Sequence, residues 1–151
     1  HTHPSIAGKD RKMDIIEIEK ILELHREWLE SDGKSGAQAD LIDADLSGAD
    51  LRHADLRRAE LSGADLSDAE LNFADLSFAD LSGADLRDAD LKSSILSSAK
   101  FEGADLRRAE LSGADLSDAG LSFADLRDVD LSGVKLSGVD LSEAILSEAL
   151  V

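Results

Sequence analysis

Between Ala39 and Glu148 one five-residue phrase recurs 22 times without an insertion: alanine in 18 of the copies, usually an acidic residue, leucine and two variable residues. The central position is leucine in every copy except one, where Phe101 stands. A period of five matches neither the 3.6-residue period of a helix nor the two-residue period of a strand, so neither element places all these leucines on one face. The chain must therefore turn after each phrase.

A short repeat that cannot bury its own apolar face indicates a stacked solenoid, in which each turn rests on its neighbours. Phrases such as residues 64–68 and 84–88 follow an A(D/N)LXX pattern, and over about three quarters of its length the chain resembles the pentapeptide-repeat family. The resemblance implies an all-β solenoid, a right-handed quadrilateral β-helix with four phrases per coil and about 5.5 coils. Alanine and leucine are then inside, and the other three positions outside.

An interior filled with leucine and alanine leaves no room for a cofactor or substrate, so we expect no cofactor. The sequence has no cysteine, which excludes disulfides and thiolate metal sites. It also contains neither an apolar run of the ~20 residues that span a bilayer nor a signal-peptide core. We therefore expect a cytoplasmic protein that does not bind membranes.

The region before the repeats divides into two parts. Residues 1–12 precede Met13 and show no periodicity, and we interpret them as a disordered or expression-derived segment. Residues 13–38 are predicted to form a capping helix and linker, with residues 39–151 as the solenoid. Asp14 is the expected N-cap and Gly33 the expected stop. Apolar residues and one histidine follow helical spacing between them: Ile15, Ile18, Ile21, Leu22, His25, Trp28 and Leu29.

Because the first coil would otherwise expose the end of the leucine column, this helix is predicted to be a lid on it. The alternative is a helix that binds a partner or a membrane surface. The segment carries more acid than base, which disfavours an anionic membrane.

At the other end no cap is evident. The last residues include apolar groups at positions that are acidic or absent elsewhere, and the candidates for a contact are Ile145, Leu146, Leu150 and Val151. Since an uncovered end invites edge pairing, we predict a homodimer through the C-terminal coil. A chain cut short is the alternative.

Acidity is concentrated in the repeats. Residues 39–151 contain 25 Asp and Glu against 10 Lys and Arg, a net charge of −15 out of −17 for the whole chain. With coils ~4.8 Å apart the rod would be roughly 26 Å long. That is about one charge per 1.8 Å, close to the ~1.7 Å of duplex DNA.

Residues 20 apart become neighbours on one face if four phrases make a coil. One such column is Asp45, Asp65, Asp85, Asp105 and Asp125, and a second column of Arg87, Arg107 and Arg127 lies beside it. Like charges at strand spacing repel each other. The two columns are either scaffold chemistry that neutralises itself or a recognition surface.

Three outward apolar residues form a further candidate contact site. Phe73 and Phe78 fall on adjacent faces of one coil, and Ile95 stacks near Phe78. Exposed apolar groups that cluster suggest contact sites. The alternative is partial shielding by neighbouring Arg, Asn and Ser side chains.

Catalysis finds little support, because His25 and His53 are isolated and no phosphate-cradling glycine loop is present. Direct nucleic-acid binding would require a basic surface. Two hypotheses follow. The first is a non-catalytic scaffold for an unknown protein partner. The second is a DNA-mimicking inhibitor or protector of a DNA-binding enzyme, as in family members that act on DNA gyrase.

Overall fold

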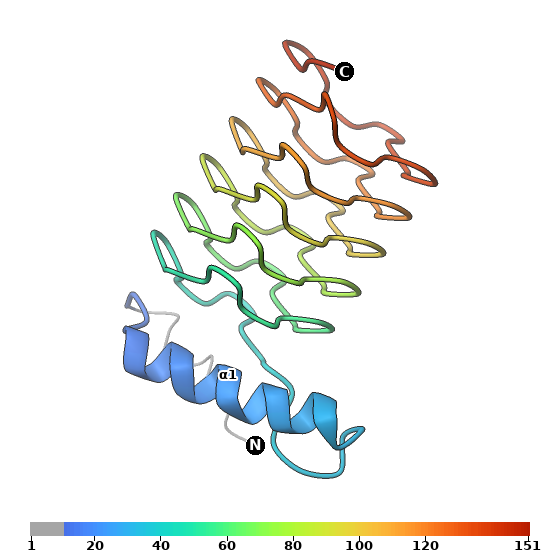
Figure 1. Ribbon diagram of the computed structural model, residues 1–151. Helices are drawn as coiled ribbons and strands as arrows, with labels where there is room; N and C mark the ends of the chain where they lie inside the picture. The colour runs from blue at the N-terminus through green and yellow to red at the C-terminus, as the bar shows by residue number, and fades with distance from the viewer. Residues whose placement is uncertain (1–10) are drawn as a thin grey trace.

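The computed structural model describes residues 11–151 and shows a stack of four-sided coils standing on a single helix (Figure 1). Within the described residues α1, Ile15–Glu30, is the only helix. From residue 39 the chain winds as a right-handed quadrilateral β-helix, as predicted.

The coils are held together by isolated parallel bridges instead of long strands. The bridges join a phrase to the fourth phrase after it, from Asp40 with Glu60 to Asp130 with Leu150, and only the pair Glu110 with Asp130 in this described series lacks one. At the first bridge the N–H of Leu41 donates to the backbone carbonyl of Glu60 at 2.8 Å. The N–H of Glu60 donates in turn to the backbone carbonyl of Ala39 at 3.0 Å. Each coil therefore consists of four phrases, one on each of four faces. We number the faces by their first phrases: face 1 starts with residues 39–43, face 2 with 44–48, face 3 with 49–53 and face 4 with 54–58. Every fourth phrase after the first belongs to the same face.

A tight turn separates consecutive phrases. The backbone N–H of the first residue of each phrase donates to the backbone carbonyl of the central residue of the phrase before it. Ala44, for example, donates to the Leu41 carbonyl at 3.1 Å. The last residue of the phrase takes a positive φ, +58° at Asp43, +63° at Phe73 and +67° at Gly83. This left-handed conformation favours Gly, Asn and Asp and disfavours β-branched residues. It explains why glycine or aspartate fills this place so often.

The interior is the predicted leucine column. Leu46, Leu66 and Leu86 are fully buried on one face, and Phe101 is equally buried in place of a leucine. Full burial of each such side chain contributes roughly 1.5–3 kcal/mol relative to exposure. Ser94 replaces an inward alanine, and its hydroxyl donates to the Leu91 carbonyl at 2.6 Å. In the part of the chain that the structure describes, no buried side-chain nitrogen or oxygen lacks a partner.

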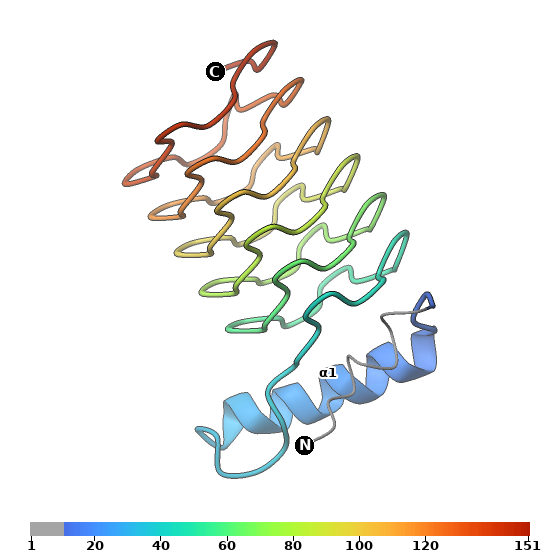
Figure 2. The same ribbon diagram turned by 180° about the vertical axis from the view of Figure 1, so that it is seen from behind.

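Helix α1 crosses the open end of the first coil, which is seen from both sides in Figures 1 and 2. Asp14 caps it as predicted, in a capping box with Glu17. The helix ends at Glu30, and Gly33, with φ of +84°, closes the following turn by donating its N–H to the Trp28 carbonyl.

The buried face of α1 is narrower than the sequence pattern predicted. Ile18, Ile21 and His25 are buried, but Ile15 is half exposed. Met13, which is 4% exposed, belongs to the core at this end of the helix. Ile15 thus lies in the helix, as its spacing predicted, but Met13, the residue before the N-cap, packs in the core at this end of the helix.

The expected boundary at residue 12 crosses a structured bridge. Lys12 forms a parallel β-bridge with Asp45, in which the N–H of Met13 donates to the backbone carbonyl of Asp45 at 3.0 Å. These two residues add one bridge below face 2. The rest of the segment interpreted as disordered or expression-derived, residues 1–10, lies outside the described residues. Between residues 11 and 151 no helix is long and apolar enough to cross a bilayer.

Candidate protein-interaction surfaces

The predicted columns of face 2 form an alternating ionic ladder. Arg87 donates to Asp85 in its own coil at 2.6 Å, and its Nε lies 3.8 Å from Asp105 in the next. Arg107 repeats this arrangement with Asp105 and Asp125, and Arg127 with Asp125. The ladder is therefore internally neutralised in its upper half, which favours scaffold chemistry there.

The lower members of the column are bound differently. Asp45 and Asp65 each accept from the backbone N–H and the hydroxyl of the serine two residues on, Ser47 and Ser67. The same turn recurs on other faces, and it explains why an acidic residue precedes the leucine. The Ser47 hydrogen bonds lower the pKa of Asp45, and the Arg52 side chain lowers the pKa of Asp50 to about 2.

The predicted apolar patch is divided between two stacked pairs. The Phe73 ring lies parallel to the His53 ring one coil below, with centroids 5.1 Å apart. The Phe78 ring lies under the guanidinium of Arg58, 5.9 Å from ring centroid to Cζ. Both phenyl groups remain more than half exposed, and Ile95 is 43% exposed. The structure thus places the three residues along face 4 and its edge, with each ring stacked on a residue of the preceding coil.

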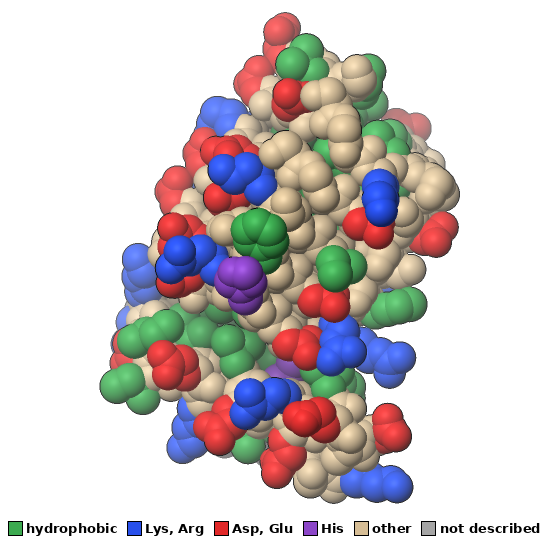
Figure 3. Space-filling model, in the orientation of Figure 1, with side chains coloured by type: hydrophobic (Ala, Val, Ile, Leu, Met, Phe, Trp, Pro, Cys, Tyr) green, Lys and Arg blue, Asp and Glu red, His purple; other side chains and the backbone are tan. Residues whose placement is uncertain are grey.

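Charge is unevenly distributed over the four faces. Faces 1, 2 and 3 carry net charges of −6, −5 and −3, whereas face 4 carries −1. The charged residues of face 4 are Asp55, Arg57, Arg58, Asp75, Asp115, Asp118 and Lys135. In Figure 3 hydrophobic and uncharged surface occupies the middle of the view, with clusters of Asp, Glu, Lys and Arg toward its margins. The least acidic face is therefore also the one that bears the exposed Phe78 and Ile95.

A groove of about 370 Å³ runs between α1 and face 4. Leu29 and Asp32 line it from the helix and its terminal turn, and Arg57, Arg58, Ser77 and Phe78 line it from the coils. Sequence reasoning missed this site. The side of the groove formed by the coils could have been predicted, since Arg58 and Phe78 are 20 residues apart and therefore lie one above the other on face 4.

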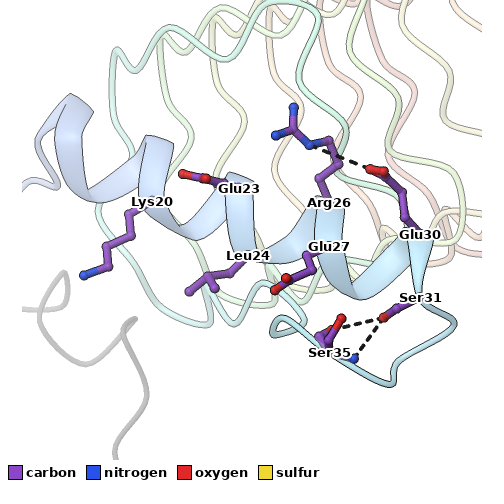
Figure 4. Close-up of a pocket in the computed structure, with 8 residues that line it drawn as sticks. All are labelled: Lys20, Glu23, Leu24, Arg26, Glu27, Glu30, Ser31 and Ser35. Carbon is purple, nitrogen blue, oxygen red and sulfur yellow. Dashed lines mark hydrogen bonds and ion pairs between the residues drawn. The ribbon is translucent and has the colours of Figure 1, made fainter.

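A larger depression of about 610 Å³ lies against α1 and the turn that follows it (Figure 4). Its charged side chains include the Arg26–Glu30 pair, and the Ser31 hydroxyl accepts from the Ser35 N–H at 2.9 Å. Lys20, Leu24 and Ser35 point away from the coils. The depression brings together no set of groups suited to acid–base or nucleophilic chemistry.

The two candidate histidines also differ in environment. His25 is fully buried beneath α1, while His53 is exposed on the rod. Among residues 11–151 no group of three His, Cys, Asp or Glu is placed to hold a metal ion.

At the C-terminal end the column is open. Ile145 is 45% exposed, Leu150 62% and Val151 92%. The core side chains around them, Val134, Leu136, Val139, Leu141 and Ala144, are only partly buried.

These features define a pentapeptide-repeat β-helix, and the chain belongs to that family. The family described as pentapeptide repeats (8 copies) matches residues 37–72, 69–108, 94–133 and 109–148. A search of the curated proteins found no match.

Solved structures of the same kind are similar. The pentapeptide repeat protein alr5209 from Nostoc PCC 7120 is 34% identical, over 75% of this chain and 92% of that one, with a TM-score of 0.59. HetL from the cyanobacterium Nostoc sp. PCC 7120, involved in heterocyst differentiation regulation, is 35% identical over 76% of this chain, with a TM-score of 0.51. The chain spans 60% of the length of HetL. QnrB1, a plasmid-mediated fluoroquinolone resistance protein, is 25% identical over 67% of this chain and 66% of that one, with a TM-score of 0.40, and this likeness carries no functional argument.

Proposed function

We propose that this protein is a non-catalytic, highly acidic scaffold that binds another protein through its outer surface. The observation that carries the proposal is the closed interior, in which the inward leucines of the middle coils are at most 2% exposed. The outward side chains are left to interact with other molecules, on a backbone held in register from each coil to the next. A rigid backbone of this kind reduces the ordering cost of binding to that of the surface side chains.

Affinity capture tests this proposal. The immobilised full chain is exposed to extract of the source cells at 0.15 M and 0.5 M NaCl, beside polyglutamate of equal charge. We expect at least one protein to be retained by the chain and not by polyglutamate. Recovery of the same proteins on both matrices would show non-specific polyanion binding and contradict a specific scaffold.

A second function, inhibition or protection of a DNA-binding enzyme such as gyrase by DNA mimicry, is favoured by the charge of −15 in the repeats. The ladder argues against using all of face 2 for it, since Asp85, Asp105 and Asp125 are engaged by arginines. Carboxylates without such partners are the better candidates. The side chains of Asp68, Glu102 and Asp118 have neither an ion pair nor a hydrogen bond in the described structure.

Gyrase supercoiling titrated with the protein tests the DNA mimic. Inhibition at micromolar concentration that weakens in a triple variant, Asp68→Asn with Glu102→Gln and Asp118→Asn, would support it. No effect at tens of micromolar would remove it.

We further propose that the protein forms a homodimer through its C-terminal coil. The exposed Ile145, Leu150 and Val151 surround an open apolar end, and α1 covers the other end. Because α1 blocks head-to-tail stacking, a two-fold end-to-end contact is the arrangement that closes.

Light scattering across a hundredfold range of concentration tests the dimer. The variant Ile145→Asp with Leu150→Asp restores the acidic residues found one coil lower, Asp125 and Asp130, so the coil should still fold. We expect twice the chain mass for the parent and the single-chain mass for the variant. Equal masses would contradict the dimer.

A further inference from the structure

We propose that the groove formed by Leu29, Asp32, Arg57, Arg58, Ser77 and Phe78, named here the cap groove, is a docking site for a peptide segment of the protein partner. The segment carries a carboxylate beside an aliphatic or aromatic side chain. The carboxylate binds Arg58, and the apolar side chain lies between Leu29 and Phe78. This inference rests on the proposed scaffold function and names its site.

Arg58 supplies the first argument. Every other arginine of residues 11–151 makes an ion pair with a carboxylate, but Arg58 makes none with any described residue. Its guanidinium lies over the Phe78 ring. A guanidinium stacked in this way keeps its N–H edge available for bidentate binding of a carboxylate.

The internal duplication supplies a comparison. Residues 54–69 are identical to residues 104–119, so Arg58 and Arg108 have the same local sequence and the same φ of +61°. Arg108 binds Asp88, the residue one coil before it, with its Nε 3.0 Å from the carboxylate. Arg58 instead faces Phe78, the residue one coil after it. The sequence around the arginine therefore does not decide whether it is paired, and its neighbours on the rod do.

The apolar walls supply the second argument. Phe78 is 61% exposed, and Leu29 is partly exposed on the opposite side of the groove. Phe78 also stands at a residue position with φ of +61°, where glycine is the unstrained choice. A volume of about 370 Å³ lies at the small end of the ~300–1,000 Å³ range of ligand pockets. That volume suits a few side chains and not a folded domain.

The cap also makes the groove rigid. The carbonyl of Arg57 accepts from His25 Nε2 at 2.8 Å, and the carbonyl of Arg58 accepts from Gln38 Nε2 at 2.7 Å. Both arginines are thus fixed at the backbone by the helix and its linker, which reduces the ordering cost of binding.

Charge selects among possible occupants. The groove carries two cations and one carboxylate, Asp32, in a chain of net charge −17. Repulsion from the whole rod grows with the charge of the ligand, so a nucleic acid is disfavoured far more than a peptide with one or two carboxylates. Asp32 lines the groove and would repel the carboxylate of the bound peptide. Its removal should therefore strengthen binding, whereas removal of Arg58 should weaken it.

A random twelve-residue peptide library displayed on phage, panned against the full chain, provides the probe. We expect enriched sequences with Asp or Glu within two residues of Leu, Ile or Phe. The best peptide is then synthesised with a fluorophore, and its Kd is measured by anisotropy at 0.15 M NaCl. Arg58→Ser should weaken binding by at least about tenfold, as expected for loss of a charge-assisted hydrogen bond. Phe78→Ser should weaken it comparably, and Asp32→Asn should strengthen it two- to fivefold.

Each variant that should weaken binding has a matched control. Arg108→Ser makes the same change of charge in the same local sequence, and Phe123→Ser removes a phenyl group from the same position of the phrase. Serine occupies that position in Ser93 and Ser98, so all four variants should fold, which thermal unfolding verifies. The proposal would be overturned if panning enriched no sequence, or only sequences without acidic residues. It would also be overturned if a control variant weakened peptide binding as much as its matched groove variant. The extract capture described above does not use the peptide library, so it separates failure of this site from failure of the scaffold function.

Discussion

The imidazole Nδ1 of His25 accepts a hydrogen bond from the backbone N–H of Ala39 at 2.9 Å, which ties α1 to the first residue of the first phrase. Because Nδ1 is an acceptor, the proton of the neutral ring is on Nε2, from which it is donated to the Arg57 carbonyl at 2.8 Å. One fully buried side chain thus joins the cap to two points of the first coil.

Replacing His25 with leucine should destabilise the cap by about 2–4 kcal/mol, because the substitution keeps an apolar body but leaves two buried backbone groups without partners, each at a cost of about 1–3 kcal/mol. Urea unfolding and amide exchange of α1 provide the measurement. His53→Asn is the control, because asparagine tolerates the positive φ of this exposed position and the change removes only the stacking on Phe73, so it should change stability much less. An unchanged His25→Leu variant would mean that water replaces both bonds.

The same residue predicts a dependence of stability on pH. Burial lowers the pKa of His25 from its ordinary 6.5, while the hydrogen bond to the Arg57 carbonyl and the charge of Asp55 oppose this less strongly. The unfolded chain then binds a proton at a higher pH than the folded one. Stability is therefore fully present above pH 6.5 and falls as the pH decreases from there toward the folded pKa.

Denaturation midpoints at pH 7.5, 6.5, 5.5 and 5.0 check this dependence. The decline should disappear in His25→Leu over this range. The aspartates with lowered pKa, such as Asp55 and Asp85, contribute stability that is lost only below about pH 4, so they do not obscure the test.

The repeat, its inward leucines and the helical cap were predictable because each depends on local periodicity. The ladder was also predictable, since every fourth phrase stacks in any four-phrase coil. Two features were not. The burial of Met13 instead of Ile15 depends on how the helix meets the coil, and the cap groove depends on Leu29 and Arg58 approaching from distant parts of the chain. Neither contact follows from a period.

Turn chemistry predicts a contrast at Gly83. Its φ is +67°, and a Cβ built there meets no atom within 4 Å, so a substitution tests backbone strain alone. Gly83→Val should cost about 1–2 kcal/mol, because β-branched residues are strained in the left-handed region. Gly83→Asn should be nearly neutral. Similar losses for the two variants, measured by thermal unfolding, would show that packing and not φ decides this position.

Phe101, the single aromatic residue among the inward leucines, predicts that exchanging leucine and phenylalanine destabilises the protein in either direction. Phe101 is fully buried, between Leu81 and Leu121 in the stack of face 1. Phe101→Leu, although it restores the repeat consensus, should destabilise the protein by about 1 kcal/mol in urea unfolding because it leaves a small void. Leu121→Phe should cost about 1–3 kcal/mol by overpacking. A gain in stability for Phe101→Leu would show that the surrounding leucines can collapse into the space.

The ionic ladder of face 2 predicts a dependence on salt. Arg107 lies between Asp105 and Asp125, with its Nη2 2.6 Å from the first and its Nε 3.7 Å from the second. In Arg107→Gln these two carboxylates lose the guanidinium between them, so the melting temperature should fall at low ionic strength. The deficit should shrink toward 1 M NaCl, where the Debye length is only ~3 Å. Exposed pairs contribute little, so Arg26→Gln, which breaks an exposed pair on α1, should show almost no change. A deficit at Arg107 that persists unchanged in 1 M NaCl would assign the role of Arg107 to packing of its aliphatic stem instead of charge.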